Sequence, residues 1–221
     1  MFDLALRPAK DRLLGPVAER VAGSMGATAL TALGLAMAVG AAAGAALGHR
    51  WWPLALWLGS RAVDGLDGLV ARCRGEDSDL GGYLDMLADT LAYVAVPLGV
   101  AVGAGGGTPT WAALSLLLGS FYLNTTSWAY LSALLEKRGA GVATSGESTS
   151  IRMPTGLIEG AETIVFYAAF LLWPQRAVQL FAAMTLLVVV SVGQRVRWAA
   201  HDLAVCCSGR ASSRARSEGQ R

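Results

Sequence analysis

The sequence predicts an all-α membrane protein with six transmembrane helices and an N-terminal amphipathic helix that lies on the membrane surface. Of its 221 residues, 54% are hydrophobic and only 15% are charged, whereas soluble domains carry about a quarter charged residues. The mean hydropathy is +0.46. Long stretches without charge are the third indication, because a helix of about 20 apolar residues crosses a bilayer.

Six segments have the length and composition of transmembrane helices. A glycine-rich stretch at 103–109 divides a long uncharged run into two of them, and Pro174 ends another. Trp51 and Trp52 form an aromatic interface anchor at the start of the second segment. The six segments cover about 27–48, 51–71, 90–103, 109–135, 156–173 and 177–200.

The distribution of Lys and Arg predicts the orientation in the membrane. These residues are concentrated before the first span, after the second and fourth spans, and after the sixth. The alternate loops contain only Arg50 and Arg176. By the positive-inside rule, both termini and the loops after spans two and four lie in the cytoplasm of a multi-pass cell-membrane protein.

The chain is expected to have three parts. Residues 1–26 combine apolar and charged positions in the manner of an amphipathic juxtamembrane helix. Residues 27–203 form the membrane domain. Residues 204–221 form a basic tail whose Ser, Arg and Gly content predicts disorder.

Glycines at every fourth position of the first span form a small-residue face that allows close helix approach. This face could serve packing inside the bundle or between two copies, and a homodimer is expected. The glycines are Gly40, Gly44 and Gly48.

The overall charge and the cysteines limit the possible partners. A net charge of +2 argues against a nucleic-acid partner. Cys73, Cys206 and Cys207 have neither disulfide-framework nor zinc spacing, which indicates reduced thiols. Cys206 and Cys207 follow a predicted membrane helix, where lipidation is the alternative to inert thiols.

Four aspartates lie at the predicted cytoplasmic ends of spans two and three. Asp64 and Asp67 are three positions apart, and Asp85 and Asp89 are four apart, so each pair shares one helix face. A short linker makes the two helices antiparallel neighbours, which allows all four carboxylates to converge.

Such a cluster predicts a site for divalent cations. Clustered carboxylates near hydrocarbon must take up protons or bind cations. Their hard oxygens, without His or Cys, favour Mg²⁺, Mn²⁺ or Ca²⁺. Two such ions can clamp a pyrophosphate and position an attacking oxygen. The alternatives are a transporter or ion-binding protein that uses intramembrane carboxylates, and a scaffold without activity.

Two residues beside the cluster have a structural and a functional interpretation. Gly68 is either a packing residue or a place where a nucleotide approaches the backbone. Arg72 is either a positive-inside anchor or a phosphate contact.

The complete pattern D-x2-D-G-x2-A-R-x8-G-x3-D-x3-D, from Asp64 to Asp89, resembles the signature of CDP-alcohol phosphotransferases, also called CDP-alcohol phosphatidyltransferases. It fixes eight positions over 26 residues. The six-span layout is similar to the same family. The chain departs from the family at the turn before span one, where only Thr31 of a Thr-Pro-Asn-like stretch and its following Thr is retained.

The resemblance implies a Mg²⁺-dependent transferase of phospholipid biosynthesis. Asp89 would be the base that deprotonates the acceptor hydroxyl, and CMP would leave. The donor would be a CDP-linked lipid, with CDP-diacylglycerol as the family expectation. Gly68, Arg72 and Ser78 would bind the CDP moiety. Two Mg²⁺ ions, with Mn²⁺ as an alternative, would be held by Asp64, Asp67, Asp85 and Asp89.

The acceptor alcohol is left open by the sequence. Phosphorylated acceptors such as inositol phosphate or glycerol 3-phosphate need cations, and Lys137, Arg138, Arg152 and Arg195 are the candidates. Positive-inside topology explains the same residues equally well.

Two further polar groups lie in the last three spans. Glu159 and Glu162 either line the acceptor pocket or form structural ion pairs. A polar run at 124–127 predicts hydrogen bonds between helices.

Overall fold

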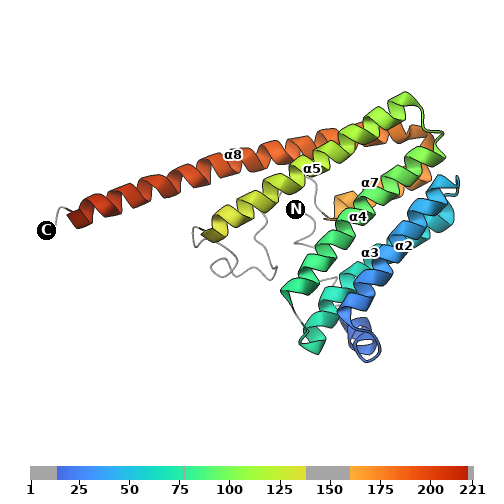
Figure 1. Cartoon of the computed structure of the whole chain (residues 1–221), viewed down its shortest axis with the longest axis horizontal. Coiled ribbons are helices and arrows are strands. Elements are labelled where there is room, and N and C mark those ends of the chain that lie inside the picture. The colour runs from blue at the N-terminus through green and yellow to red at the C-terminus, as the bar shows by residue number, and fades with distance from the viewer. Residues whose placement is uncertain (1–13, 77, 138–159, 219–221) are drawn as a thin grey trace.

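The computed structural model of the protein describes residues 14–76, 78–137 and 160–218, with side chains described as far as residue 201. Within these ranges the regular structure is helical and no strand is present, in agreement with the predicted all-α class (Figure 1). The elements are α2 (Ala27–Ala46), α3 (Trp51–Arg74), α4 (Asp79–Gly103), α5 (Thr108–Lys137), α7 (Gly160–Leu172), the short 3₁₀ helix η1 (Pro174–Arg176) and α8 (Ala177–Glu218).

The connection between α3 and α4 is set by a glycine and a serine. Helix α3 ends at Gly75, which has a φ of +64° and adopts the left-handed conformation common at helix C-termini. Helix α4 begins after Ser78, whose Oγ accepts a hydrogen bond from the backbone N–H of Gly81 at 3.1 Å. The predicted break between spans three and four is confirmed, because residues 104–107 separate α4 from α5.

Helix α2 packs along both α3 and α4 in the N-terminal group of helices (Figure 1). Its approach to α4 depends on residues without bulky side chains. A Cβ atom on Gly99 would collide with the backbone of Ala42, and one on Gly103 would collide with Ala45. Helices α3 and α4 therefore each pack against α2, and their backbones make few contacts with each other. Contact between these two predicted neighbours is made by their side chains.

The glycine face of α2 packs inside this chain. A Cβ on Gly44 would collide with Trp52 of α3, and one on Gly40 would lie 3.1 Å from Leu56 Cδ1. Gly48 lies in the turn after α2 with a φ of +81°. Of the two predicted uses of this face, contact between α2 and α3 accounts for Gly40 and Gly44.

Helices α5 and α8 form a second group that diverges from α2, α3 and α4 (Figure 1). Helix α7 joins the two groups because it contacts α3, α4 and α8. The junction is aromatic: Phe170 of α7 packs edge-on against Phe181 of α8, and both are fully buried.

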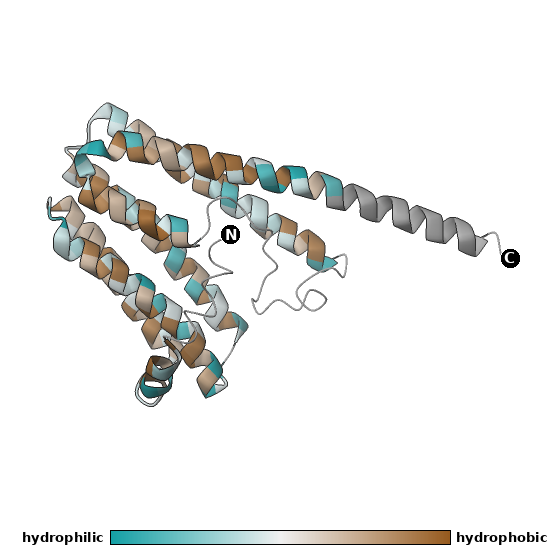
Figure 2. Ribbon diagram, turned by 180° about the vertical axis from the view of Figure 1, so that it is seen from behind, coloured by the Kyte–Doolittle hydropathy of each residue, from teal (hydrophilic) through white to brown (hydrophobic). Residues whose placement is uncertain are grey.

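Within the part of the chain that the structure describes, three helices are long and apolar enough to cross a membrane, namely Ala27–Ala46, Asp79–Gly103 and the Pro174–His201 segment. Figure 2 shows the apolar residues along them. Helix α7 is apolar but shorter in the described part of the chain, Gly160–Leu172. The helices match the predicted segments, whereas six membrane crossings remain a prediction.

Both ends of the described chain are helical, which was predicted for the N-terminal end only. Residues 14–22 are helical, and Ala18 packs against Leu30 and Val70 at one end of the bundle. The rest of the predicted amphipathic helix lies outside the described residues. Helix α8 continues to Glu218 where the sequence predicts a disordered tail. No proline follows residue 174, so nothing in the sequence interrupts the helical register there.

Candidate metal and nucleotide site

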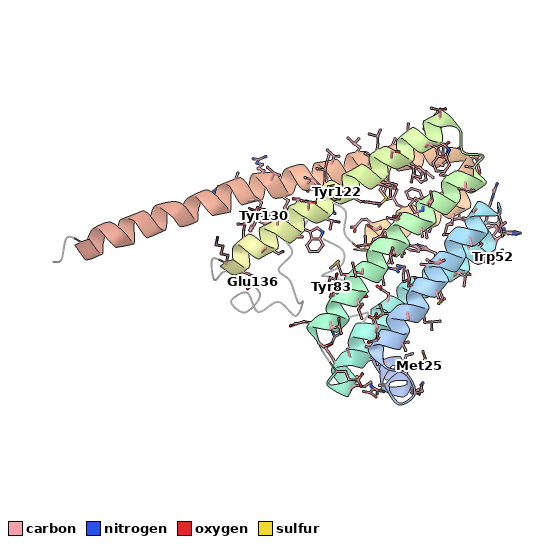
Figure 3. The ribbon with its side chains drawn as sticks, in the orientation of Figure 1. Met25, Trp52, Tyr83, Tyr122, Tyr130 and Glu136 are labelled. Atoms are coloured by element: carbon pink, nitrogen blue, oxygen red, sulfur yellow. The ribbon has the colours of Figure 1, made fainter. Side chains whose placement is uncertain are left out.

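The aspartates lie at the end of the bundle where α3 finishes and α4 begins. This end carries Met25 and Tyr83 and lies opposite the end that carries Trp52 (Figure 3). Helical spacing directs each aspartate pair to one side of its own helix. Helix α2, packed against both α3 and α4, determines how the two pairs face each other.

Asp64 of α3 and Asp89 of α4 meet at a shared positive charge. Arg61 Nη1 donates a hydrogen bond to Asp89 Oδ1 at 2.6 Å and lies 3.5 Å from Asp64 Oδ1. The structure therefore brings two of the four predicted ligands, Asp64 and Asp89, together from two helices.

Aromatic side chains hold the Arg61 guanidinium in place. Its Cζ lies 4.8 Å from the centre of the Trp57 ring and 5.6 Å from that of Tyr93, distances at which a cation is attracted to an aromatic face. Arg61 Nη2 also donates to Ser60 Oγ at 3.0 Å. Tyr167 of α7 stacks on Trp57 and donates its hydroxyl hydrogen to the backbone oxygen of Tyr93 at 2.6 Å.

Asp67 is oriented by helix α2. Its Oδ2 accepts a hydrogen bond from Thr31 Oγ1 at 2.8 Å, and its Oδ1 accepts one from the backbone N–H of Gly68 at 2.6 Å. The carboxylate is buried. Thr31, the one residue retained from the family's turn, therefore fixes the orientation of a predicted metal ligand.

The donor set fits hard divalent cations, although its side chains are not yet gathered around one point. Among the described residues, no three acidic, His or Cys side chains lie close enough together to hold a metal ion as they stand. The position between Asp64 and Asp89 nevertheless already holds a positive group, Arg61 Nη1. Carboxylate oxygens are the ligands that Mg²⁺, Mn²⁺ and Ca²⁺ prefer.

The predicted nucleotide-binding residues lie beside this cluster along the chain. Gly68 and Arg72 share a face of α3, because a Cβ on Gly68 would lie 3.6 Å from Arg72 Nη1. Arg72 is exposed, so its guanidinium is accessible to a phosphate. Ser78 caps α4 through its hydrogen bond with Gly81, which is a structural role that the sequence analysis did not assign.

The predicted acceptor-binding residues are only partly described. Lys137 is the exposed last residue of α5. Arg195 of α8 is buried, and its Nη1 donates to Asn124 Oδ1 of α5 at 2.9 Å. This bond confirms the prediction that the polar run at 124–127 connects helices. Arg138, Arg152 and Glu159 lie outside the described residues, as do the side chains of Cys206 and Cys207.

Arg61 is the site residue that sequence reasoning missed. A single arginine in the middle of a predicted transmembrane segment, three positions before Asp64, was the available signal. Charged residues within such segments are rare and usually have a partner. Tyr93 and Trp57 gave no comparable signal, because aromatic residues are common in membrane helices.

The family model described as CDP-alcohol phosphatidyltransferase matches residues 25–205. Inner membrane protein YnjF of Escherichia coli is 37% identical over 150 residues, which cover 66% of this chain and 68% of that protein. The archaetidylinositol phosphate synthase of Methanothermobacter thermautotrophicus is 32% identical over 163 residues, which cover 74% of this chain and 73% of that protein.

Two crystal structures of the Mycobacterium tuberculosis phosphatidylinositol phosphate synthase share the fold at 21% identity. The structure in complex with manganese and citrate has a TM-score of 0.63, over 82% of this chain and 86% of that one. The structure with CDP-DAG bound has a TM-score of 0.64, over 84% and 92%. The family model matches more than half of the chain, so this chain belongs to the CDP-alcohol phosphatidyltransferase family. Membership of this family favours an enzyme over a transporter.

Proposed function

We propose that the protein is an integral membrane enzyme that transfers a substituted phosphate group from a CDP-alcohol to an alcohol acceptor and releases CMP. The observation that carries this proposal is the approach of Asp64 and Asp89, from two helices, to one position that holds the positive charge of Arg61. The relatives include archaetidylinositol phosphate and phosphatidylinositol phosphate synthases. They support a CDP-linked lipid donor, such as CDP-diacylglycerol, and a role in phospholipid biosynthesis.

The metal centre would be formed by all four aspartates of the motif. Asp64, Asp67, Asp85 and Asp89 would hold two Mg²⁺ ions. Mn²⁺ is the alternative, which manganese in a related crystal structure supports. When bound, such ions neutralise negative charge on a pyrophosphate and its leaving group.

The chain's own residues would orient the donor and move one proton. Gly68, without a side chain, would let the CDP moiety approach α3, where Arg72 would pair with a phosphate. Ser78 would contact the nucleotide near the start of α4. Asp89 would accept the proton of the acceptor hydroxyl, and that oxygen would then attack the phosphorus that carries the donor alcohol.

A phosphorylated polyol fits the acceptor side best. Inositol phosphate and glycerol 3-phosphate carry a dianionic group, and Lys137, Arg138, Arg152 and Arg195 would supply the positive charge to bind it. Arg195 is the candidate with the most defined position. It is only 6% exposed, and its Nε has no hydrogen-bond partner among the described residues.

The membrane arrangement follows from the charge distribution and the helices. Residues 27–203 would cross the cell membrane six times, with both termini and the metal site on the cytoplasmic side. Residues 1–26 would lie along the membrane surface. Two copies would associate as a homodimer through helix faces other than the one formed by Gly40 and Gly44, because those glycines already contact α3.

The test is CMP release from CDP-diacylglycerol by the purified full-length protein with Mg²⁺. A panel of inositol phosphate, glycerol 3-phosphate, serine, free inositol and phosphatidylglycerol would identify the acceptor, and we expect a phosphorylated polyol. Asp89→Asn removes the proton acceptor but keeps its shape, so turnover should fall at least about a thousandfold without loss of folded protein.

Asp79→Asn is the matched control, because Asp79 is an exposed acid in the first turn of the same helix. This control should retain wild-type turnover. Full CMP release by the Asp89 variant would contradict the assignment of the base. No release by wild type with any acceptor of the panel would contradict the proposed reaction.

A further inference from the structure

Arg61 points its guanidinium at two of the carboxylates assigned to the metal site. We propose that Arg61 is a built-in counter-ion of this site. It occupies a cation position between Asp64 and Asp89, and a divalent ion must displace it from these carboxylates in order to bind. The inference rests on the proposed function, because it takes Asp64 and Asp89 as metal ligands.

The ion pair is partly buried, with its arginine shielded from solvent. The Arg61 side chain is 6% exposed, and the two carboxylate side chains are about 30% exposed. Surface ion pairs contribute little because water and salt screen them. A buried charge without its partner is strongly unfavourable. Metal-free protein therefore needs Arg61 to neutralise Asp64 and Asp89, which lie near each other on facing helices.

The contacts of Nη1 are the ones that a metal ion would take. This nitrogen lies 2.6 Å from Asp89 Oδ1 and 3.5 Å from Asp64 Oδ1. The guanidinium nitrogen therefore occupies the space beside these oxygens that a bound cation would need. A metal ion at this place also meets repulsion from the guanidinium charge. Arginine and metal therefore compete for the same oxygens.

The structure also provides a place that keeps Arg61 after displacement. The guanidinium lies against the rings of Trp57 and Tyr93, and its Nη2 bonds Ser60 Oγ. These contacts do not involve the carboxylates. These contacts can therefore keep the guanidinium against the rings when Nη1 leaves Asp64 and Asp89. Arg61 is thus a positioning residue that lowers the affinity of the site for its ions.

The experiment measures Mn²⁺ binding to the full-length protein in detergent, without substrates, by the loss of the free Mn²⁺ signal in electron paramagnetic resonance. Arg61→Met keeps an unbranched side chain that packs on Trp57 and Tyr93 but removes the charge. We expect it to bind Mn²⁺ at least tenfold more tightly than wild type. Arg50→Met, at the opposite end of α3 and exposed, is the matched control and should bind as wild type does.

Arg61→Lys keeps a charge but lacks the planar fork that reaches two carboxylates. It should bind Mn²⁺ several-fold more tightly than wild type, and it decides the matter if the Met variant does not fold. Thermal unfolding gives a second readout. Without metal, Arg61→Met should unfold at a lower temperature than wild type, and Mn²⁺ should raise its unfolding temperature by a larger amount.

Unchanged or weaker Mn²⁺ binding by a folded Arg61 variant overturns this inference and leaves the proposed function intact. A wild-type protein that binds no Mn²⁺, or binds it equally well after Asp64→Asn, overturns the proposed metal site itself. The two failures are therefore distinguishable.

Discussion

Removing the hydroxyl of Thr31 should weaken metal binding through Asp67. Thr31→Val keeps the shape of the side chain but eliminates the 2.8 Å hydrogen bond to Asp67 Oδ2. The same hydroxyl lies 3.2 Å from the backbone oxygen of Ala27, but its single proton favours the shorter bond to a charged acceptor. Hydrogen bonds to charged groups contribute about 1.5–3 kcal/mol.

The size of the effect follows from this bond. Because about 1.4 kcal/mol corresponds to a factor of ten, loss of the bond should weaken divalent-ion binding about ten- to a hundredfold. This is also the range found when a hydrogen-bond partner of a metal ligand is removed. Asp67 retains only its contact with the Gly68 N–H from the pair of bonds that now orients it.

The assay is a Mn²⁺ titration of wild type, Thr31→Val and Thr31→Ser, followed by CMP release at subsaturating Mg²⁺. The serine variant keeps the hydroxyl, so it should bind metal within about twofold of wild type. CMP release by the valine variant should recover at high Mg²⁺. Equal metal affinity in all three proteins would refute the view that α2 positions a ligand of the site.

Two further predictions concern packing and the acceptor. Gly99→Ala places a methyl group against the backbone of Ala42, so it should lower the free energy of unfolding by about 1–3 kcal/mol or more in chemical denaturation. Gly119→Ala, at an open position on α5, should leave it unchanged or raise it by up to about 1 kcal/mol. Equal stability of the two variants would contradict the close α2–α4 contact. In steady-state kinetics, Arg195→Gln should raise the KM for a phosphorylated acceptor at least tenfold and leave the KM for the CDP-linked donor unchanged. An unchanged acceptor KM would show that Arg195 does not bind the acceptor.

The helices were predictable because their signals are local. Uncharged stretches, the glycine-rich sequence at 103–109 and Pro174 mark the ends of segments without reference to any other part of the chain. The pairing of aspartates on one helix face also follows from helix geometry alone. These predictions needed no knowledge of how the helices pack.

The arrangement of the site was less predictable because it depends on packing between distant segments. The sequence indicated that α3 and α4 are direct neighbours, but α2 packs against both and controls how their side chains meet. The orientation of Arg61 toward Asp89 depends on the rings of Trp57 and Tyr93, which belong to different helices. Spacing within one helix contains no information about such contacts.

Ser78 shows that a serine at one position can be interpreted either as a helix cap or as a ligand contact. The family resemblance implies a nucleotide contact for Ser78, and in the structure its Oγ caps α4. A serine just before a helical segment is also a common N-cap signal, so the structural role was available from the sequence. The disorder of the tail after residue 203 was inferred from composition alone, and it stays a prediction.

The most direct test of the account is the number of divalent ions bound per chain. A Mn²⁺ titration of the purified protein should give two ions per chain for wild type, and the number should fall in Asp64→Asn and in Asp85→Asn. A wild-type protein that binds no Mn²⁺, or variants that bind as many ions as wild type with unchanged affinity, would contradict the claim that these aspartates form a metal centre.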